Sequence, residues 1–310
     1  MDNVCHTLVG LAVARAGLNR TTRLATATLA ISANLPDIDV LVFAADIPSV
    51  SFRRGWTHGP IAQLLLPLLC AGVMWQLARR RTEHRSESPP GSTRANFWWL
   101  LALSFIGIYT HVFLDYLNNY GVRLLMPFSH RWFYGDAVFI VDIWLWLMLG
   151  LGWWRSRGGD TRPARLGLAA ASIYIALMLI SARSARSIIA GKWMEVTGAL
   201  PAHLMVGPVP VNPFRKDIII DAGDHYVTGR FDWLPRRVIF DPGQIAKNAQ
   251  QPAVAAAQTD PRVRGIVVWS RFPFWTLRAA PDGVEVTVSD VRFARMGRAG
   301  FAATTIVRQP

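Results

Sequence analysis

Long apolar segments with almost no charge dominate the first 190 residues of this chain and limit the folds open to it. A transmembrane helix needs about 20 mostly apolar residues, because the bilayer core offers no water to a polar side chain. Only 17% of the chain is charged, whereas about a quarter of a globular protein usually is. The segments that predict membrane-spanning helices are 24–45, 61–78, 97–117, 138–154 and 165–182.

The start of the chain predicts one further, shorter helix. The apolar stretch 4–17 is too short to cross a bilayer, so we expect it to insert partway or to pack inside the bundle. It lacks the basic leading region and the small-residue cleavage site of a signal peptide, so we expect it to be retained. Cys5 and Cys70 both lie in apolar segments and indicate small buried side chains, with no disulfide framework.

The net charge of +13 raises the question of nucleic-acid binding, but its placement favours a membrane. Arginines crowd the stretches 79–96 and 155–165, each beside a predicted span. Basic clusters at span ends mark cytoplasmic loops and contact anionic head groups. No DNA-reading motif is present. We therefore expect a multi-pass membrane protein with no nucleic-acid partner.

This topology brings a set of histidines and aspartates to the outer ends of the spans. They are His6, Asp37, Asp39, His58, His111, Asp115 and Asp142. Arg183, Arg186 and Lys192 would then lie outside, which weakens the orientation. An inverted topology would carry the whole set to the cytoplasmic face together, so the prediction of a cluster holds for either orientation.

The composition changes near residue 195, which predicts two domains. Residues 1–195 form a transmembrane helical domain that carries the site, and 196–310 form an extramembrane, mostly antiparallel β domain on the outer face. The fold class is mainly α, a polytopic membrane helix bundle with this β domain at its C-terminus. The predicted β runs are Asp217–Asp221, Val263–Trp269, Val284–Val288 and Thr304–Val307, and segment 245–258 is interpreted as one helix.

The first polar motif is Asn34-Leu35-Pro36-Asp37-Ile38-Asp39. Pro36 should break or kink the helix and turn the two carboxylates toward a cavity, where they could converge on a cation. The alternative is the C-terminus of a helix with solvated acids.

The second motif runs from Arg53 to Pro60 and contains Arg54, Thr57 and His58. Pro60 suits the first turn of a helix, which places His58 at the positive end of the helix dipole, where anions bind. Arg54 could hold a phosphate through its planar fork. The alternative is an interfacial loop whose histidine merely caps the helix.

The third motif is the most specific. His111 and Asp115 stand at positions i and i+4, on one face of an apolar helix, so both could bind one metal ion or form a structural pair. Asp142 follows an apolar run and could bind a metal or orient a ligand. His84, His130, Arg131, His203 and His225 are interpreted as bystanders.

Together these motifs resemble bacterial inner-membrane metal-dependent hydrolases of the YdjM type, over roughly residues 1–150. That family is distantly similar to zinc phospholipase C and P1 nuclease, which cleave phosphate esters with zinc clusters. The resemblance implies that His6, Asp37, Asp39, His58, His111 and Asp115 are metal ligands. Many relatives have Ser where this chain has Gly59, and the resemblance does not extend to 200–310.

The leading hypothesis is a membrane-embedded hydrolase with one to three divalent ions, zinc above all, that cleaves a phosphoester or ester of a lipid or lipid-linked substrate. The predicted catalytic residues are Asp142, with Asp37 or Asp39 as other candidates for the general base, and Arg54, which would hold an anionic oxygen. The alternatives are a metal-stabilised scaffold or a cation transporter. No acid or histidine lies mid-span in 61–78 or 165–182, which disfavours transport. The oligomeric state is left open.

Overall fold

The computed structural model describes residues 1–44, 49–83, 95–294 and 301–308. It therefore leaves His84, Arg85 and Arg94 of the predicted basic loop outside the described residues. The chain forms two compact units, and the division runs within one long helix, between Ser181 and Ala182. The first unit comprises Met1–Asp39 with Arg54–Ser181, and the second comprises Val40–Arg53 with Ala182–Pro310. The domain boundary predicted from composition lies at 195–196.

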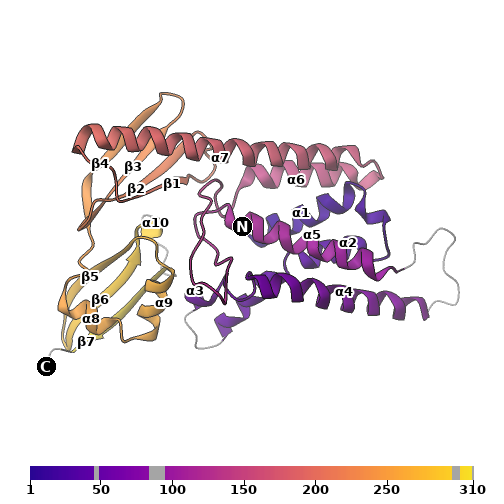
Figure 1. The fold of residues 1–310 in the computed structure, drawn as a ribbon, viewed down its shortest axis with the longest axis horizontal. Coiled ribbons are helices and arrows are strands. Elements are labelled where there is room, and N and C mark those ends of the chain that lie inside the picture. The colour runs from indigo at the N-terminus through magenta and orange to yellow at the C-terminus, as the bar shows by residue number, and fades with distance from the viewer. Residues whose placement is uncertain (45–48, 84–94, 295–300, 309–310) are drawn as a thin grey trace. The chain divides into compact units, whose positions relative to one another are not determined.

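Helices make up the first unit and run along the parts of the chain coloured indigo to magenta in Figure 1. In chain order they are α1 (Asn3–Arg15), η1 (Leu18–Arg20), α2 (Ala25–Ser32), η2 (Leu35–Ala44), α4 (Pro60–Glu83), α5 (Phe97–Tyr116), α6 (Ile143–Arg155), η3 (Ser156–Gly158) and α7 (Arg162–Thr197). The 3-10 helix η2 and the helix α7 continue into the second unit.

Short polar side chains set the starts of several of these helices. Asp2 caps α1 by accepting from the backbone nitrogens of Val4 and Cys5, and Asn96 caps α5 through Trp99. Pro60 opens α4, where its missing N–H costs no hydrogen bond. Pro36 follows the end of α2, and the chain continues as a 3-10 helix, which confirms the predicted break.

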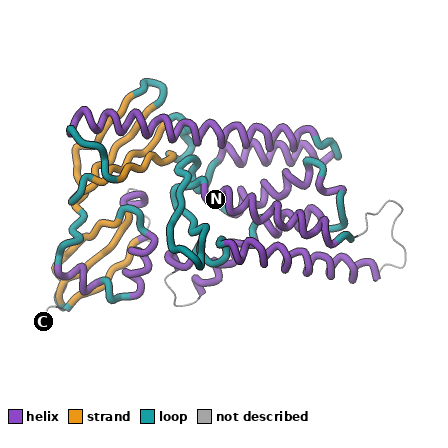
Figure 2. The backbone as a smooth tube through the Cα atoms, in the orientation of Figure 1, coloured by secondary structure: helices purple, strands orange, loops and turns teal. Residues whose placement is uncertain are grey.

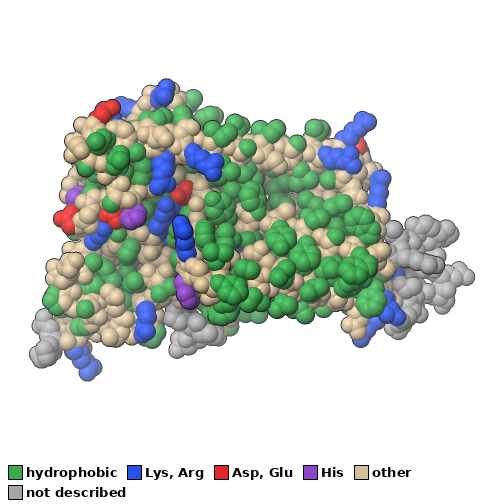
Figure 3. All heavy atoms as spheres, in the orientation of Figure 1, with side chains coloured by type: hydrophobic (Ala, Val, Ile, Leu, Met, Phe, Trp, Pro, Cys, Tyr) green, Lys and Arg blue, Asp and Glu red, His purple; other side chains and the backbone are tan. Residues whose placement is uncertain are grey.

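Within the part of the chain that the structure describes, three helices are long and apolar enough to cross a membrane. They are α4 over Pro60–Arg80, α5, and α7; α2 and η2 would add a fourth span if this pair, bent by 48°, counts as one. Figure 3 shows apolar side chains spread over the face of these helices that it displays. The prediction of a polytopic bundle is thus confirmed in part.

The predicted span 138–154 is shorter in the structure. Asp142 caps α6, so the helix begins only at Ile143 and has 13 residues. At 1.5 Å per residue it is about 20 Å long, less than the roughly 30 Å of a bilayer core.

Close packing between α2 and α5 positions the polar motifs. A Cβ atom on Gly107 would overlap the side chain of Ser32, so the glycine allows these two helices to approach. Leu29 and Leu103 are fully buried in the same contact. The approach brings the end of α2, and with it Asp37, toward the last turns of α5. Cys5 and Cys70 are buried and free, as predicted.

The second unit contains two antiparallel sheets, drawn as arrows in Figure 1 and orange in Figure 2. The four-stranded sheet has the order β1 (His203–Pro208), β2 (Arg215–Asp221), β3 (His225–Asp232), β4 (Arg237–Ala246), and the three-stranded sheet has the order β5 (Pro273–Ala280), β6 (Gly283–Asp290), β7 (Ala302–Val307). The remaining helices of this unit are α3 (Ser49–Phe52), α8 (Pro252–Ala257), α9 (Pro261–Trp269) and α10 (Val291–Ala294).

Each sheet buries one face under a helix. Ala185 and Ile189 of α7 pack on Ile218 and Ile220 of the four-stranded sheet. Val254 of α8 and Ile266 of α9 pack on the three-stranded sheet. The antiparallel β domain, including the runs 217–221, 284–288 and 304–307, is confirmed.

Two local predictions in this unit were wrong. The run Val263–Trp269 is helix α9, because Asp260 caps it, Pro261 starts it, and Val263, Ile266 and Trp269 recur on one buried helical face. Segment 245–258 is not one helix, since β4 runs to Ala246 and Pro252 starts α8 only later.

Candidate metal centre

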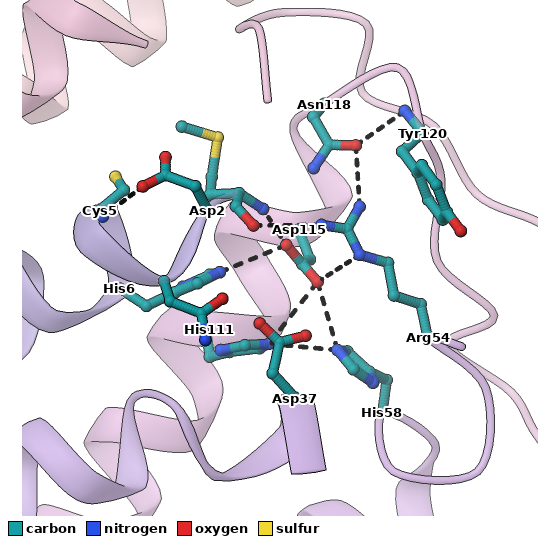
Figure 4. Close-up of polar contacts among 12 residues, drawn as sticks. Asp2, Cys5, His6, Asp37, Arg54, His58, His111, Asp115, Asn118 and Tyr120 are labelled. Atoms are coloured by element: carbon teal, nitrogen blue, oxygen red, sulfur yellow. Dashed lines mark hydrogen bonds and ion pairs between the residues drawn. The ribbon is translucent and has the colours of Figure 1, made fainter. Parts of the chain in front are cut away.

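Four buried side chains from three segments of the first unit converge on one point. They are Asp37 of η2, His58 just before α4, and His111 and Asp115 from the last turns of α5. One ligand atom from each lies within 4.8 Å of the others, and Figure 4 shows the side chains directed toward one another. The structure thus places together residues that are up to 78 positions apart in the chain.

The distances between these atoms suit a single small cation. The Nε2 atoms of His58 and His111 are 3.2 Å apart, and Asp115 Oδ2 lies 3.2 Å from the first and 3.6 Å from the second. Asp37 Oδ1 is farther out, 3.9 Å from His111 Nε2. Four donors placed tetrahedrally at about 2.0–2.1 Å from a zinc ion would lie roughly 3.3 Å from one another.

Hydrogen bonds on the far side of each imidazole place the ring protons. His111 Nδ1 lies 2.7 Å from the carbonyl oxygen of Ala33, which can only accept, so Nδ1 carries the proton. Thr57 donates its hydroxyl hydrogen to Asp39 Oδ2 at 3.1 Å and therefore accepts from His58 Nδ1 at 2.9 Å. In the neutral rings both Nε2 atoms then carry lone pairs that face each other.

Burial keeps His58 in the form that binds metals. Loss of water around the ring lowers the pKa of the His58 imidazole, although contact with Asp115 opposes the shift. With the ring protons on Nδ1, the two Nε2 lone pairs and Asp115 Oδ2 lie within 3.6 Å of one another and can share one positive charge. The donor set therefore fits a divalent cation, and its mixture of nitrogen and oxygen is typical of zinc and its first-row neighbours.

Arg54 is the buried cation that holds Asp115 in place. Its Nε lies 2.9 Å from Asp115 Oδ2, Nη1 donates to Asn118 Oδ1 at 3.2 Å, and Nη2 donates to the carbonyl oxygen of Met1 at 3.2 Å. The guanidinium also lies over the ring of Tyr120. All three guanidinium nitrogens thus have protein partners, so Arg54 positions Asp115; its predicted contact with an anionic oxygen of a substrate stays a prediction.

His6 lies on the other side of Asp115. Its ring stacks on that of His111 with centroids 3.8 Å apart, and its Nε2 is 3.4 Å from Asp115 Oδ1. Among the described residues neither ring nitrogen of His6 has a hydrogen-bond partner. The α-amino group of Met1 contacts the same carboxylate oxygen. Oδ1 of Asp115 therefore faces His6 and the α-amino group, whereas Oδ2 faces Arg54, His58 and His111.

Asp39 and Asp142 lie outside the four-residue group. Asp39 accepts from the backbone nitrogen of Arg54 at 2.7 Å and from Thr57, so it supports His58 from behind. Asp142 accepts from the first backbone nitrogens of α6 and from the hydroxyl of Tyr174. In the structure Asp142 caps α6, and its predicted catalytic role stays a prediction.

Sequence reasoning missed two side chains near the group. Asn118 is fully buried and accepts from Arg54 and from the backbone nitrogens of Tyr120 and Gly121. Its position three residues after Asp115, at the same helix end, was an available signal. Arg123 lies over the ring of Trp132, and its guanidinium occupies the space that a Cβ on Gly55 would need. Only the tertiary fold reveals that contact.

The other candidates are distributed as follows. His130 and Arg131 are exposed in the loop before α6, and His203 is exposed at the start of β1. His225 is partly buried and pairs with Asp224. At Gly59 a Cβ would overlap the carbonyl of Met126, so a serine at this position would need a shifted backbone.

Comparison with known proteins gives one family and two relatives. The family model described as YdjM inner membrane protein matches residues 1–185. The chain is 23% identical over 288 residues to the uncharacterized protein YfhP of Bacillus subtilis (strain 168), covering 89% of this chain and 79% of that one. It is 30% identical over 158 residues to the inner membrane protein YbcI of Escherichia coli (strain K12), covering 41% and 82%. No solved structure matches.

Proposed function

The chain belongs to the YdjM inner membrane protein family, and from this premise we propose that it is a membrane-embedded, metal-dependent hydrolase. The observation that carries the proposal is the buried meeting of the Nε2 atoms of His58 and His111 with Asp115 and Asp37. Such a charge arrangement is costly inside a membrane protein unless a cation uses it. The three candidate spans agree with a site at the boundary between lipid and water.

Three residues would hold the ion most tightly. His58 Nε2, His111 Nε2 and Asp115 Oδ2 lie within 3.6 Å of one another and are fully buried. Three protein ligands with one open position are typical of catalytic zinc sites. When bound, a divalent ion polarises an ester oxygen and lowers the pKa of a water molecule toward neutrality. Ala33, Thr57 and Arg54 keep the three ligands aligned.

Asp37 is the candidate general base. It is the outermost member of the group, 3.9 Å from His111 Nε2, and it also lines a surface pocket. Asp37 also belongs to the group that converges on His58 and His111, whereas Asp39 and Asp142 lie outside it. We propose that Asp37 Oδ1 takes the proton from the attacking water.

The substrate we propose is a phosphoester of a lipid or a lipid-linked compound. The surroundings of Asp37 support this class, because Ile31 and Ile38 beside it are about half exposed and apolar. A water-soluble substrate would gain little binding energy from this apolar surface. A lipid can contact it from within the bilayer. We further propose that the group faces the periplasm, since Arg155 and Arg157 mark the opposite end of α6 as cytoplasmic.

A metal-stabilised scaffold is the second candidate. The specific observation in its favour is that four protein donors would fill a tetrahedral site and leave no position for substrate. The two functions differ in the coordination of Asp37. A structural ion keeps all four ligands, whereas the hydrolase needs Asp37 free to take a proton.

Elemental analysis followed by a substrate screen tests the proposal. The full chain, purified in detergent, should contain a stoichiometric divalent metal, which His111→Ala should lose and the exposed-site control His130→Ala should keep. Phospholipid and generic phosphodiester substrates are then tested before chelation, after chelation and after return of the metal. The proposal predicts chelator-sensitive hydrolysis that Asp37→Asn lowers at least 100-fold while the metal stays bound.

The same variants separate the two candidates. Loss of the ion in Asp37→Asn, together with a wild type that hydrolyses none of the substrates, would favour the scaffold. Cobalt substitution adds a spectroscopic check, because the absorption of Co²⁺ distinguishes four protein ligands from three ligands and an exchangeable water. A wild type that binds no metal at all would overturn both.

A further inference from the structure

A surface pocket on the first unit is lined by one member of the metal-binding group. Its volume is about 430 Å³, and it lies between the start of α1, the end of α2 and the start of η2. Its lining includes Asn3, Ile31, Asn34, Asp37 and Ile38. Of the four donors in the group, only Asp37 lines this pocket. A molecule in the pocket could therefore reach that carboxylate.

The pocket lies at a break in a candidate membrane span. Helices α2 and η2 together are apolar enough to cross a bilayer, and they meet at a bend of 48°; Asn34 lies in the break, and Pro36 is the second residue of η2. Irregular backbone at membrane depth is tolerated where it is buried in protein or lines a cavity. Ile31 and Ile38 stand on either side of the break with 48% and 49% of their surface exposed. The lining of the pocket thus suits a hydrocarbon chain.

Asn34 supplies a polar group that lacks a partner in this apolar lining. Its Nδ2 donates to Thr7 Oγ1 and to the carbonyl of Ala30, each at 2.9 Å, which fixes the orientation of the amide. Its Oδ1 is buried and, among the described residues, accepts no hydrogen bond. A buried acceptor without a donor is unfavourable, so a ligand that brings a hydroxyl or an ammonium group would be recognised there.

We propose that this pocket binds a phospholipid from the bilayer, with one acyl chain along Ile31 and Ile38 and a head-group donor on Asn34 Oδ1. The ester of such a lipid then lies beside Asp37. Asn34 is a specificity-determining residue that selects head groups with a hydroxyl or an amine. The identity of this lipid as a substrate rests on the proposed hydrolase function, but its binding does not.

Photo-crosslinking of the full chain in lipid nanodiscs tests the binding. The probe is phosphatidylglycerol with a diazirine in one acyl chain, and the labelled residues are mapped by mass spectrometry. Wild-type protein should be labelled within 30–38, and Ile38→Trp, which fills the pocket, should reduce that labelling at least fivefold. Leu65→Trp, on an exposed apolar face of α4, is the matched control and should leave it unchanged.

A second probe tests the role of Asn34. Phosphatidylmethanol with the same diazirine has no donor in its head group, so wild-type protein should prefer the phosphatidylglycerol probe in competition. Asn34→Leu should abolish that preference. Thr7→Val removes a partner of the Asn34 amide but leaves Oδ1 in place, and it should retain the preference. Equal labelling by both probes in the wild type, or labelling spread evenly over all lipid-facing helices, overturns the proposal.

The outcome is independent of whether the protein hydrolyses lipids. Specific labelling with no hydrolysis would keep the lipid site and reject the hydrolase. Hydrolysis of a short, water-soluble phosphodiester without labelling of 30–38 would keep the hydrolase and reject the lipid site. Metal content, measured in each variant, should match that of the wild type, because none of the substituted side chains belongs to the metal-binding group.

Discussion

The Nε2 atoms of His58 and His111 lie 3.2 Å apart, and the opposite nitrogen of each ring contacts a protein oxygen. Two lone pairs at this distance oppose each other, and Asp115 adds a third source of negative potential. A divalent cation at this point would satisfy all three atoms, in addition to the ion pair between Arg54 and Asp115. The hydrogen bonds behind the rings therefore matter as much as the ligands, because they place both protons away from the centre.

The link from Asp39 through Thr57 to His58 gives the first prediction. Thr57→Val removes the hydroxyl that accepts from His58 Nδ1, so the ring can rotate or change tautomer. We expect metal affinity to fall about 10- to 100-fold, as for other residues that orient ligands. Thr57→Ser retains the hydroxyl and should bind the metal like the wild type. Competition with a chelating dye measures the metal affinity of both variants. An unchanged affinity in Thr57→Val would show that metal binding does not need the hydrogen bonds from Asp39 through Thr57 to His58.

Asp142 gives a prediction about stability instead of chemistry. Asp142→Ala removes the cap of α6 and should lower the free energy of unfolding by about 1 kcal/mol. Metal content and any hydrolysis should stay at wild-type levels. Asp142→Asn can still cap the helix and should be nearly as stable as the wild type. Thermal unfolding and elemental analysis check this, and a loss of hydrolysis in a fully metal-loaded Asp142→Ala protein would restore the catalytic role.

A buried ion pair in the second unit gives a prediction about pH. Asp290 and Arg292 pair at 2.8 Å with side chains that are fully buried, and Ser270 also donates to Asp290. Burial alone would raise the pKa of Asp290, but the ion pair and these hydrogen bonds hold that pKa below its usual value of 3.8. Because the folded pKa is the lower one, the stabilisation is complete above about pH 4 and is lost as the pH falls through the folded pKa.

Hydrogen exchange over residues 270–292, corrected for the intrinsic rate at each pH, checks this prediction. Protection in the wild type should fall as the pH drops below about 4. Asp290→Ala should lose about 3–5 kcal/mol of stability at pH 7 and show a weaker dependence on pH, because it leaves Arg292 buried without its partner. Asp224→Ala, at a side chain that is 92% exposed, is the control and should leave protection unchanged.

The orientation in the membrane gives the last prediction. His130→Cys lies in the exposed loop that precedes α6, and Arg157→Cys lies at the other end of that helix. The positive-inside rule predicts that a membrane-impermeant maleimide labels His130→Cys in intact cells and labels Arg157→Cys only after permeabilisation. The native cysteines Cys5 and Cys70 are buried and should react slowly. The opposite pattern would place the metal-binding group in the cytoplasm.

Local rules were enough for part of the candidate site. His111 and Asp115 were paired because a spacing of four residues puts two side chains on one face of any α-helix. The break at Pro36 follows from its missing N–H, and the interpretation of α4 and α5 as spans follows from their length and apolarity. Where periodicity was judged on a short run, as at Val263–Trp269, the prediction failed, because a mostly apolar run of seven residues suits a strand and a buried helix equally well.

The sequence by itself determined the membrane setting and the residues able to bind a metal, because hydrophobic length and side-chain chemistry are local properties. Only the tertiary structure decided which of those residues contact one another and which support the others. It placed His58 against His111, joined Arg54 to Asp115, set Asp39 behind Thr57 and used Asp142 as a helix cap. Those partners come from segments far apart in the chain, and the close packing of α2 against α5 is what determines which atoms meet.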